Sequence, residues 1–293
     1  MHGWLVLNKP KGIGSTKAVS AVKRALRDGG HPKVKAGHGG TLDPLASGVL
    51  PVALGEATKL SGRMLNADKA YEFTIAFGEE TDTLDGEGVV IATSAARPTR
   101  SEVETILAQF TGAIEQVPPA YSALKVDGKR AYVRARAGEM VAIRPRKVGV
   151  REIRILDGNR DRVTLAARVS KGTYIRSLAR DIARALGTVG HVAMLHRTQA
   201  GPFGLESAIS LDKMAELAMA RDLEQALLPL TAGLDDIPAL PVTPDQARLL
   251  RQGRKLAGIA AKPGLHLATD CAVPVALVEF SEGELRVVRG FNL

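Results

Sequence analysis

The sequence predicts a mixed α/β protein, and three observations support this prediction. Of the 293 residues, 45% are apolar and 24% are charged, which is typical of a folded globular chain and excludes the disordered and fibrous classes. Stretches in which apolar and polar residues alternate, as in half-buried strands, occur beside stretches with a helical repeat. These stretches lack the regular strand–helix–strand order of a doubly wound parallel sheet, so the predicted class is mixed.

The first elements are a buried strand and an amphipathic helix. Residues 4–7 are all apolar and predict a short strand, whereas residues 15–27 repeat apolar positions at helical spacing. The pair Gly29–Gly30 ends this helix, because glycine readily adopts the left-handed conformation of a C-terminal cap. Residues 71–77 alternate and predict a strand with one buried face, and residues 81–88 then form a loop. The apolar face of the helix consists of Ala18, Val19, Val22, Ala25 and Leu26.

Four more elements, three helices and one strand, are expected in the middle of the chain. Thr99 and Glu102 have the spacing of a capping box and predict the start of a helix. Residues 163–169 alternate and predict a strand, and the helix after it ends at Gly187. Another amphipathic helix is expected over residues 211–220. The apolar stripe of the helix that ends at Gly187 consists of Leu178, Ile182 and Leu186.

A turn-rich stretch, residues 229–238, predicts a domain boundary. Beyond about residue 237 the chain is predicted to form one short helix, residues 244–251, and then brief strands. The second domain is therefore expected to be a small and mainly β module. Its three predicted strands are residues 265–268, 273–280 and 285–288.

The charge of the chain is concentrated in one segment. Lys and Arg exceed Asp and Glu by 40 to 31, a formal charge of +9. Residues 121–200 contain 18 basic and 6 acidic residues, or +12, so the rest of the chain sums to −3. Such a concentration predicts a surface that follows the phosphates of a nucleic acid, although a merely solvated charged face is the alternative. Within it, residues 121–147 mix basic, aromatic and small side chains and predict a loop or short helix lying along RNA.

Several kinds of chemistry have no motif in the sequence. A single cysteine, Cys271, excludes an intramolecular disulfide and a cysteine-based zinc module, and no His-Glu-x-x-His run is present, so we expect no metal. The glycine-rich stretches fit neither phosphate-loop nor dinucleotide motifs, so we expect no nucleotide cofactor. No signal-peptide pattern and no apolar stretch of membrane-spanning length occur, which predicts a cytoplasmic protein that binds no membrane.

One acidic residue, Asp43, stands alone in the neutral, glycine-lined stretch of residues 37–51. Pro44 biases Asp43 toward an extended backbone, and the glycines allow main chain or ligand to approach its carboxylate closely. An Asp-Pro dipeptide by itself favours a turn or a helix N-cap. The context of residues 37–51 outweighs that interpretation and makes Asp43 a candidate site.

Residues 37–51, followed by Gly55-Glu56-Ala57-Thr58-Lys59, closely resemble the active-site motif of the bacterial tRNA pseudouridine-55 synthases, the TruB family. The resemblance spans roughly residues 3–235 and implies a pseudouridine synthase catalytic domain over 1–235, built on a largely antiparallel sheet with flanking helices. It further implies that residues 237–293 form a small β-barrel similar to the RNA-binding PUA domain. Four other segments match in the family's order: residues 8–12, 69–85, 116–125 and 171–178.

The resemblance implies that the chain isomerises uridine 55 in the T-arm loop of tRNA to pseudouridine. In that reaction the base of a flipped-out nucleotide leaves its ribose carbon, rotates and rejoins through a carbon atom. It is redox-neutral, so no cofactor is expected. The implied partner is the T-arm stem-loop of tRNA, bound by a monomer that requires no other protein.

The resemblance also assigns roles to individual residues. Asp43 is implied to be the catalytic carboxylate, which suits bond cleavage at a sugar carbon, although attack on the sugar, addition to the base and proton removal all stay open. Arg176 matches the basic residue paired with that aspartate, and Tyr71 matches a tyrosine that stacks on the base and helps to move a proton. His38, Tyr174 and Leu195 match positions at the extruded nucleotide. Residues implied to grip the RNA backbone are Lys125, Arg130, Arg134, Arg136 and Lys171.

For some of these residues the pattern alone suggests a plainer role. The pattern alone favours a place in the core for Tyr71, which shares a strand face with Phe73. For Arg176 it favours a phosphate contact or a charge on a helix face. Two positions depart from the family pattern: Asn8 replaces a frequent Asp and His196 a frequent Arg, which bears on RNA affinity more than on chemistry. Two other functions stay open, a guide-RNA-dependent pseudouridine synthase and a non-catalytic tRNA-binding or folding factor.

Overall fold

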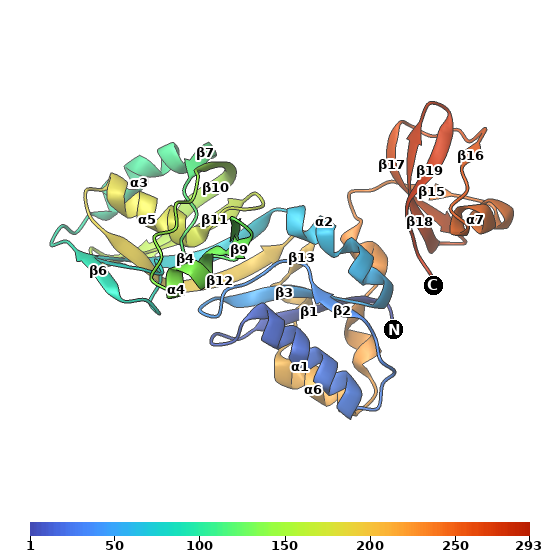
Figure 1. Cartoon of the computed structure of the whole chain (residues 1–293), viewed down its shortest axis with the longest axis horizontal. Helices are drawn as coiled ribbons and strands as arrows, with labels where there is room; N and C mark the ends of the chain where they lie inside the picture. The colour runs from blue at the N-terminus through green and yellow to red at the C-terminus, as the bar shows by residue number, and fades with distance from the viewer.

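The computed structural model describes all 293 residues, and its larger part is a ten-stranded sheet (Figure 1). Its strands are β1 (Gly3–Lys9), β2 (Ala36–His38), β3 (Ser47–Leu54), β4 (Lys69–Phe77), β7 (Gly112–Gln116), β10 (Arg146–Gly158), β11 (Arg162–Val169), β12 (Gly190–Ala200), β13 (Phe203–Gly204) and β14 (Leu227–Leu228). They lie in the order β14-β1-β3-β12-β4-β11-β10-β7, with β2 beside β3 and β13 beside β12. Every pair is antiparallel except β3 with β12, which confirms the largely antiparallel sheet.

Helices cover one face of this sheet. They are α1 (Ser15–Asp28), α3 (Arg100–Ile106), α5 (Ile175–Ala185) and α6 (Leu211–Met219). Figure 1 shows α1 and α6 together below β1 to β3, whereas α3 and α5 lie at the other end of the sheet. Because side chains of a strand alternate between faces, Leu5 and Leu7 pack against these helices while Trp4 and Val6 face the opposite side.

Elements with a clean periodicity lie where the sequence predicts them. The helix predicted over residues 15–27 is α1, which Gly29 caps and after which Gly30 has the left-handed φ of +72°. The capping box at the start of α3 is present, with the hydroxyl of Thr99 accepting from the amide of Glu102. The alternating segments 71–77 and 163–169 lie within β4 and β11, and the helix predicted before Gly187 is α5.

The basic segment of residues 121–147 is a small hairpin followed by a short helix. Strands β8 (Lys125–Val126) and β9 (Lys129–Arg130) pair, and α4 (Ala131–Arg136) continues from them. This confirms the expected loop or short helix. Another hairpin, of β5 (Glu79–Thr81) and β6 (Val90–Thr93), frames the loop of residues 81–88.

A curled five-stranded sheet follows the ten-stranded one, in the order β15-β17-β18-β19-β16 (Figure 1, upper right). Three of its strands are those predicted, and the helix α7 (Pro244–Arg251) has the predicted bounds. The strands are β15 (Ala239–Pro241), β16 (Leu256–Ala257), β17 (Gly264–Asp270), β18 (Val273–Ser281) and β19 (Glu284–Gly290).

The small sheet shares an apolar cluster with the large one. Leu267, Leu277 and Phe291 are buried in the same cluster as Trp4, on the sheet face opposite α1. Lys59, from the 3-10 helix that precedes α2 (Ser61–Asn66), donates to the carbonyl of Gly290 at 2.9 Å. The small sheet is therefore packed against its neighbour rather than tethered by a linker alone. None of the helices has the length and apolar character needed to cross a membrane.

Candidate active site

Asp43 lies in a loop between β2 and β3 that is fixed by bonds at several points. The hydroxyl of Ser15 donates to the carbonyl of Leu42 at 2.9 Å and accepts from its amide at 2.7 Å. The carbonyl of Pro44 accepts from the amide of Gly12 at 2.8 Å. The first turn of α1 and the segment before it thus hold both neighbours of Asp43. Its side chain retains 34% of its exposure and faces a cavity.

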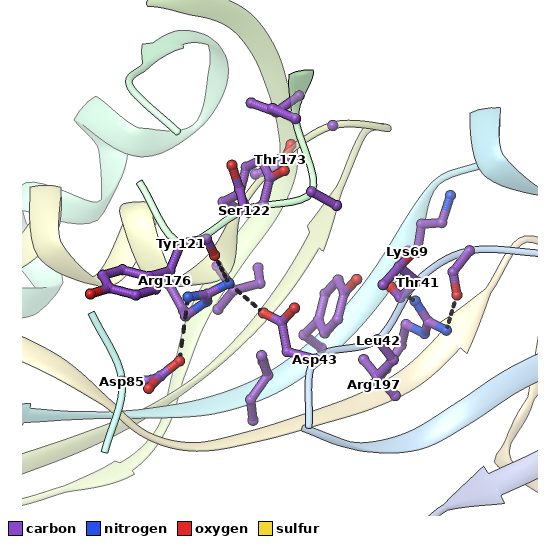
Figure 2. Close-up of a pocket in the computed structure, with 18 of the residues that line it drawn as sticks. Thr41, Leu42, Asp43, Lys69, Asp85, Tyr121, Ser122, Thr173, Arg176 and Arg197 are labelled. Carbon is purple, nitrogen blue, oxygen red and sulfur yellow. Dashed lines mark hydrogen bonds and ion pairs between the residues drawn. The ribbon is translucent and has the colours of Figure 1, made fainter. Parts of the chain in front are cut away.

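Arg176 pairs with this carboxylate, as the resemblance implies. Its Nη2 lies 2.8 Å from Asp43, and its Nη1 lies 3.4 Å from Asp85 (Figure 2). The same guanidinium donates to the carbonyls of Thr83 at 2.8 Å and Tyr121 at 3.1 Å. Arg176 stands in the first turn of α5 and is only 5% exposed, so its position is fixed by the helix and by these partners.

The cavity beside Asp43 has a volume of about 620 Å³ and has polar and apolar walls. This is large enough for a flat nucleobase with its sugar. Tyr71 lines it from β4 and is also partly buried against the large core. Six of the residues singled out in the sequence line the cavity: Asp43, Tyr71, Arg136, Tyr174, Arg176 and Leu195.

Tyr174 is held at both its backbone and its ring. The side-chain amide of Gln116 donates to the carbonyl of Tyr174 at 3.1 Å, and its oxygen accepts from the Tyr174 amide at 2.8 Å. The guanidinium carbon of Arg146 lies 4.9 Å from the ring centroid, within the range of a cation–π contact. Leu195, on β12, is buried beside Phe73 and forms an apolar part of the wall.

Four of the five residues expected to grip the RNA backbone lie outside the cavity wall. Lys171 donates to Asn66 at 3.2 Å, and Arg134 pairs with Asp127 at 3.0 Å and Glu139 at 2.6 Å. Lys125 and Arg130 are exposed on the β8–β9 hairpin.

His38 is half-buried on β2, with its Nδ1 enclosed and unpartnered. Burial, and then the charge of Arg197, lower the pKa of His38. Its neutral form is therefore favoured. His196, one of the two departures from the family pattern, bonds through Nδ1 to the hydroxyl of Ser47 at 2.9 Å and so supports the start of β3.

Three buried cations close to the Asp43 loop were not predicted as site residues. Lys9 is 0% exposed and donates to the carbonyls of Pro10 and Ile13, and burial lowers its pKa to about 8 against the opposing effect of Asp43. Burial, and then Arg197, lower the pKa of Lys69 to about 8. Arg197 itself is almost fully buried. Lys9 and Lys69 lie in segments that match the family motifs, and this match was the one feature of the sequence that pointed to them. Buried lysines are rare, so composition gives no reason to expect them.

The buried carboxylate of Asp85 was also missed. It accepts from the hydroxyl of Thr83 at 2.6 Å and from the amide of Glu87 at 3.1 Å, besides its contact with Arg176. No group of three or more His, Cys, Asp or Glu side chains is arranged to hold a metal ion. The arrangement offers a partly exposed carboxylate, that of Asp43, which is oriented by a buried arginine and lies beside a tyrosine in a partly apolar cavity. Such a group can act as a nucleophile or a base toward a planar ligand.

Known proteins match this chain over its full length. Residues 26–175 match the family described as TruB family pseudouridylate synthase (N terminal domain), and residues 176–235 match the tRNA pseudouridylate synthase B C-terminal domain. A tRNA pseudouridine synthase B of Zymomonas mobilis subsp. mobilis is 62% identical over 292 residues, which cover 100% of this chain and 96% of the relative. Another, of Novosphingobium aromaticivorans, is 59% identical over 298 residues, which cover 100% of this chain and 98% of the relative.

Solved structures show the same fold. A chain in the crystal structure of a Cbf5-Nop10-Gar1 complex superposes with a TM-score of 0.76 and 27% identity, over 99% of this chain and 85% of that one. A chain in the structure of an H/ACA RNP bound to a substrate RNA containing 2'-deoxyuridine gives a TM-score of 0.75 and 26% identity, over 99% and 85%. The similarity therefore extends through both sheets.

Proposed function

Because this chain belongs to the TruB family of pseudouridylate synthases, we propose that it converts uridine 55 in the T-arm loop of tRNA to pseudouridine. The observation that carries the proposal is the pair of Asp43 and Arg176 at the wall of a 620 Å³ cavity. The proposed substrate follows the names of the relatives, which match the chain over its full length.

The proposed reaction begins with a nucleotide turned out of the RNA loop into the cavity, because a stacked uridine cannot reach Asp43. The N1–C1′ bond then breaks, the base rotates, and a C5–C1′ bond forms. The proton on C5 is lost and N1 gains one, so the product is an isomer of the substrate. The Asp43 carboxylate is proposed to meet the positive charge that develops at the sugar carbon, or to accept a proton.

Arg176 is proposed to hold the Asp43 carboxylate in the orientation that the reaction needs, through their ion pair at 2.8 Å. Tyr71 is proposed to stack on the base and assist the proton transfer. Tyr174 and Leu195 are proposed to enclose the base, and His38 to lie against the RNA near it. No cofactor enters this scheme.

The RNA is proposed to be held along the basic segment of residues 121–147 and by Lys171. We further propose that residues 1–235 are the catalytic domain and that the curled sheet within 237–293 is a PUA-like module that binds RNA. The protein is proposed to act as a cytoplasmic monomer without a protein partner. Salt-sensitive binding is expected, since phosphate contacts release counterions.

A second candidate function, action within an RNA–protein particle, is favoured by the likeness to the chains of the Cbf5-Nop10-Gar1 complex and the H/ACA RNP. The matching relatives, named as tRNA enzymes and covered over at least 96% of their length, favour tRNA as the direct substrate.

The experiment that separates these functions supplies the purified chain with an unmodified tRNA transcript as its only RNA, and maps pseudouridine at every uridine. A second transcript carries cytidine at position 55. Product at position 55 of the first transcript and none in the second supports the proposal. Product at other uridines overturns the assignment of the target, and tight binding without product favours a guide-dependent or non-catalytic protein.

A further inference from the structure

Arg197 is a buried positive charge near Asp43 that has no role in the proposed reaction. It lies on β12 where this strand runs parallel to β3, with its Cα opposite Gly48. The side chain is within the protein, and the residue is 1% exposed. A side chain at Gly48 would collide with the backbone carbonyl of Arg197, and Gly48 has the left-handed φ of +104°, so glycine is required for the two strands to meet here.

The guanidinium of Arg197 joins the two ends of the loop that carries Asp43. Its Nη2 donates to the carbonyl of Gly40 at 3.2 Å and its Nη1 to that of Thr41 at 3.1 Å, and both residues precede Asp43. Its Nε donates to the carbonyl of Val49 at 2.7 Å, in the strand that follows the loop. Figure 2 shows this side chain and Arg176 on opposite sides of Asp43.

No carboxylate forms an ion pair with Arg197, although the guanidinium is buried. A buried charge paired only with carbonyl dipoles costs folding free energy that a packed apolar side chain would avoid. The second cation beside it, Lys69, is likewise bonded only to carbonyls, those of Met64, Leu65 and Ala67. This cost has a use if the loop must be held in one position.

We propose that Arg197 is a positioning residue for the reaction, which fixes the Gly40–Pro44 loop so that the Asp43 carboxylate stays within reach of the flipped nucleotide. Arg176 orients the carboxylate itself, and Arg197 sets the backbone from which it projects. The inference rests on the proposed catalytic role of Asp43. It adds a residue whose effect passes through another and which need not touch the reacting atoms.

The test uses the full chain with Arg197→Ala and measures single-turnover pseudouridine formation at saturating tRNA, together with tRNA affinity. We expect the rate constant to fall about 100-fold, the order of effect of a catalytic group displaced by about 1 Å, while the Kd for tRNA stays near that of the wild type. Methylguanidinium at millimolar, non-denaturing concentration should restore part of the rate, because Arg197 borders the cavity and its removal leaves an open space of matching shape.

Arg180→Ala is the matched control. Arg180 also donates to a backbone carbonyl, that of Val117 at 3.1 Å, and its side chain is 12% exposed, but it lies outside the cavity wall. Its rate should stay near the wild-type rate and should not respond to methylguanidinium.

Should Arg197→Ala fail to fold, Arg197→Lys replaces it, since lysine keeps the charge but cannot reach three carbonyls at once. We expect the lysine variant to lose rate and keep affinity.

A wild-type rate in the folded Arg197 variant overturns the inference. A loss confined to tRNA affinity, with no response to methylguanidinium, overturns it as well. Failure of the proposed function looks different, because the wild-type protein itself would then form no product on tRNA.

Discussion

The Nη2 of Arg176 lies 2.8 Å from a carboxylate oxygen of Asp43, on elements that are far apart in the sequence. The other side of the same guanidinium faces Asp85, which is buried and bonded to Thr83 and to the amide of Glu87. Both oxygens of the Asp85 carboxylate thus contact protein groups, whereas the Asp43 side chain keeps part of its surface open to the cavity. Two carboxylates share one arginine, and only one of them is available to a substrate.

Asp85→Asn is predicted to lower the rate of pseudouridine formation while leaving tRNA affinity nearly unchanged. The amide cannot hold the charge of Arg176, so the guanidinium loses one of the anchors that align it with Asp43. We expect a loss of about 10- to 100-fold in the single-turnover rate constant. The same change is expected to cost about 1–3 kcal/mol in the free energy of unfolding. A variant with wild-type rate would show that Asp85 does not align the pair.

Two arginines of helix α4 are predicted to differ in their effect on tRNA binding. Arg136 lines the cavity and has no carboxylate partner, with its guanidinium carbon 5.6 Å from the ring centroid of Tyr132. Arg134 is already paired with Asp127 and Glu139. Arg136→Ala should reduce the slope of log Kd against log salt by roughly 0.7–0.9, the value for one phosphate contact. Arg134→Ala should change the slope less, and equal slopes for both variants would contradict this reading of the segment.

Lys69 is predicted to make the protein more stable as the pH rises from 8 to 10.5. Burial, followed by Arg197, lowers its pKa from 10.5 to about 8 in the folded chain, so in this window the unfolded chain binds more protons. Stability therefore increases with pH, and the full cost of the buried charge is present below pH 8. Relative to Lys69→Met, the wild type should gain up to about 3 kcal/mol of unfolding free energy across this window. Urea unfolding at each pH measures the stability difference between the wild type and Lys69→Met. A difference that does not change with pH would show that Lys69 does not cause the pH dependence.

Phe291→Ala is predicted to destabilise the contact between the two sheets. Phe291 is 1% exposed and shares a cluster with Trp4 of the large sheet. The loss of a buried phenyl ring should cost about 3–5 kcal/mol of unfolding free energy. Urea unfolding, followed by the fluorescence of Trp4, the one tryptophan of the chain, reports on this contact directly. Val288 is exposed, so Val288→Ala serves as the control and should have little effect on the free energy of unfolding.

The elements that the sequence predicts well are those with one buried face. Helix α1 and strands β4 and β11 show a single period because one side of each meets the core. Strand β3 is buried on both faces and contains Pro51, so its apolar run has no alternation to read. Strand β10 is interrupted by two register shifts, which break its period.

The residues of the site also differ in how well the sequence predicts them. Asp43 is visible because it is a lone acid in a glycine-lined stretch, and the family resemblance adds its partners. Arg197 is not visible, because its role depends on the parallel pairing of β3 with β12, which joins residues 149 positions apart. A single sequence also gives no reason to expect a buried arginine whose partners are all backbone carbonyls.

The substitution Asp43→Asn tests whether the Asp43 carboxylate performs the chemistry. The amide has nearly the same shape but neither the charge nor the nucleophilicity of the carboxylate. Single-turnover reactions at saturating unmodified tRNA, with pseudouridine quantified at position 55, should give product with the wild type and none with the variant. The Kd for tRNA should be similar in both. Product formation by Asp43→Asn at a rate near the wild-type rate would contradict the account.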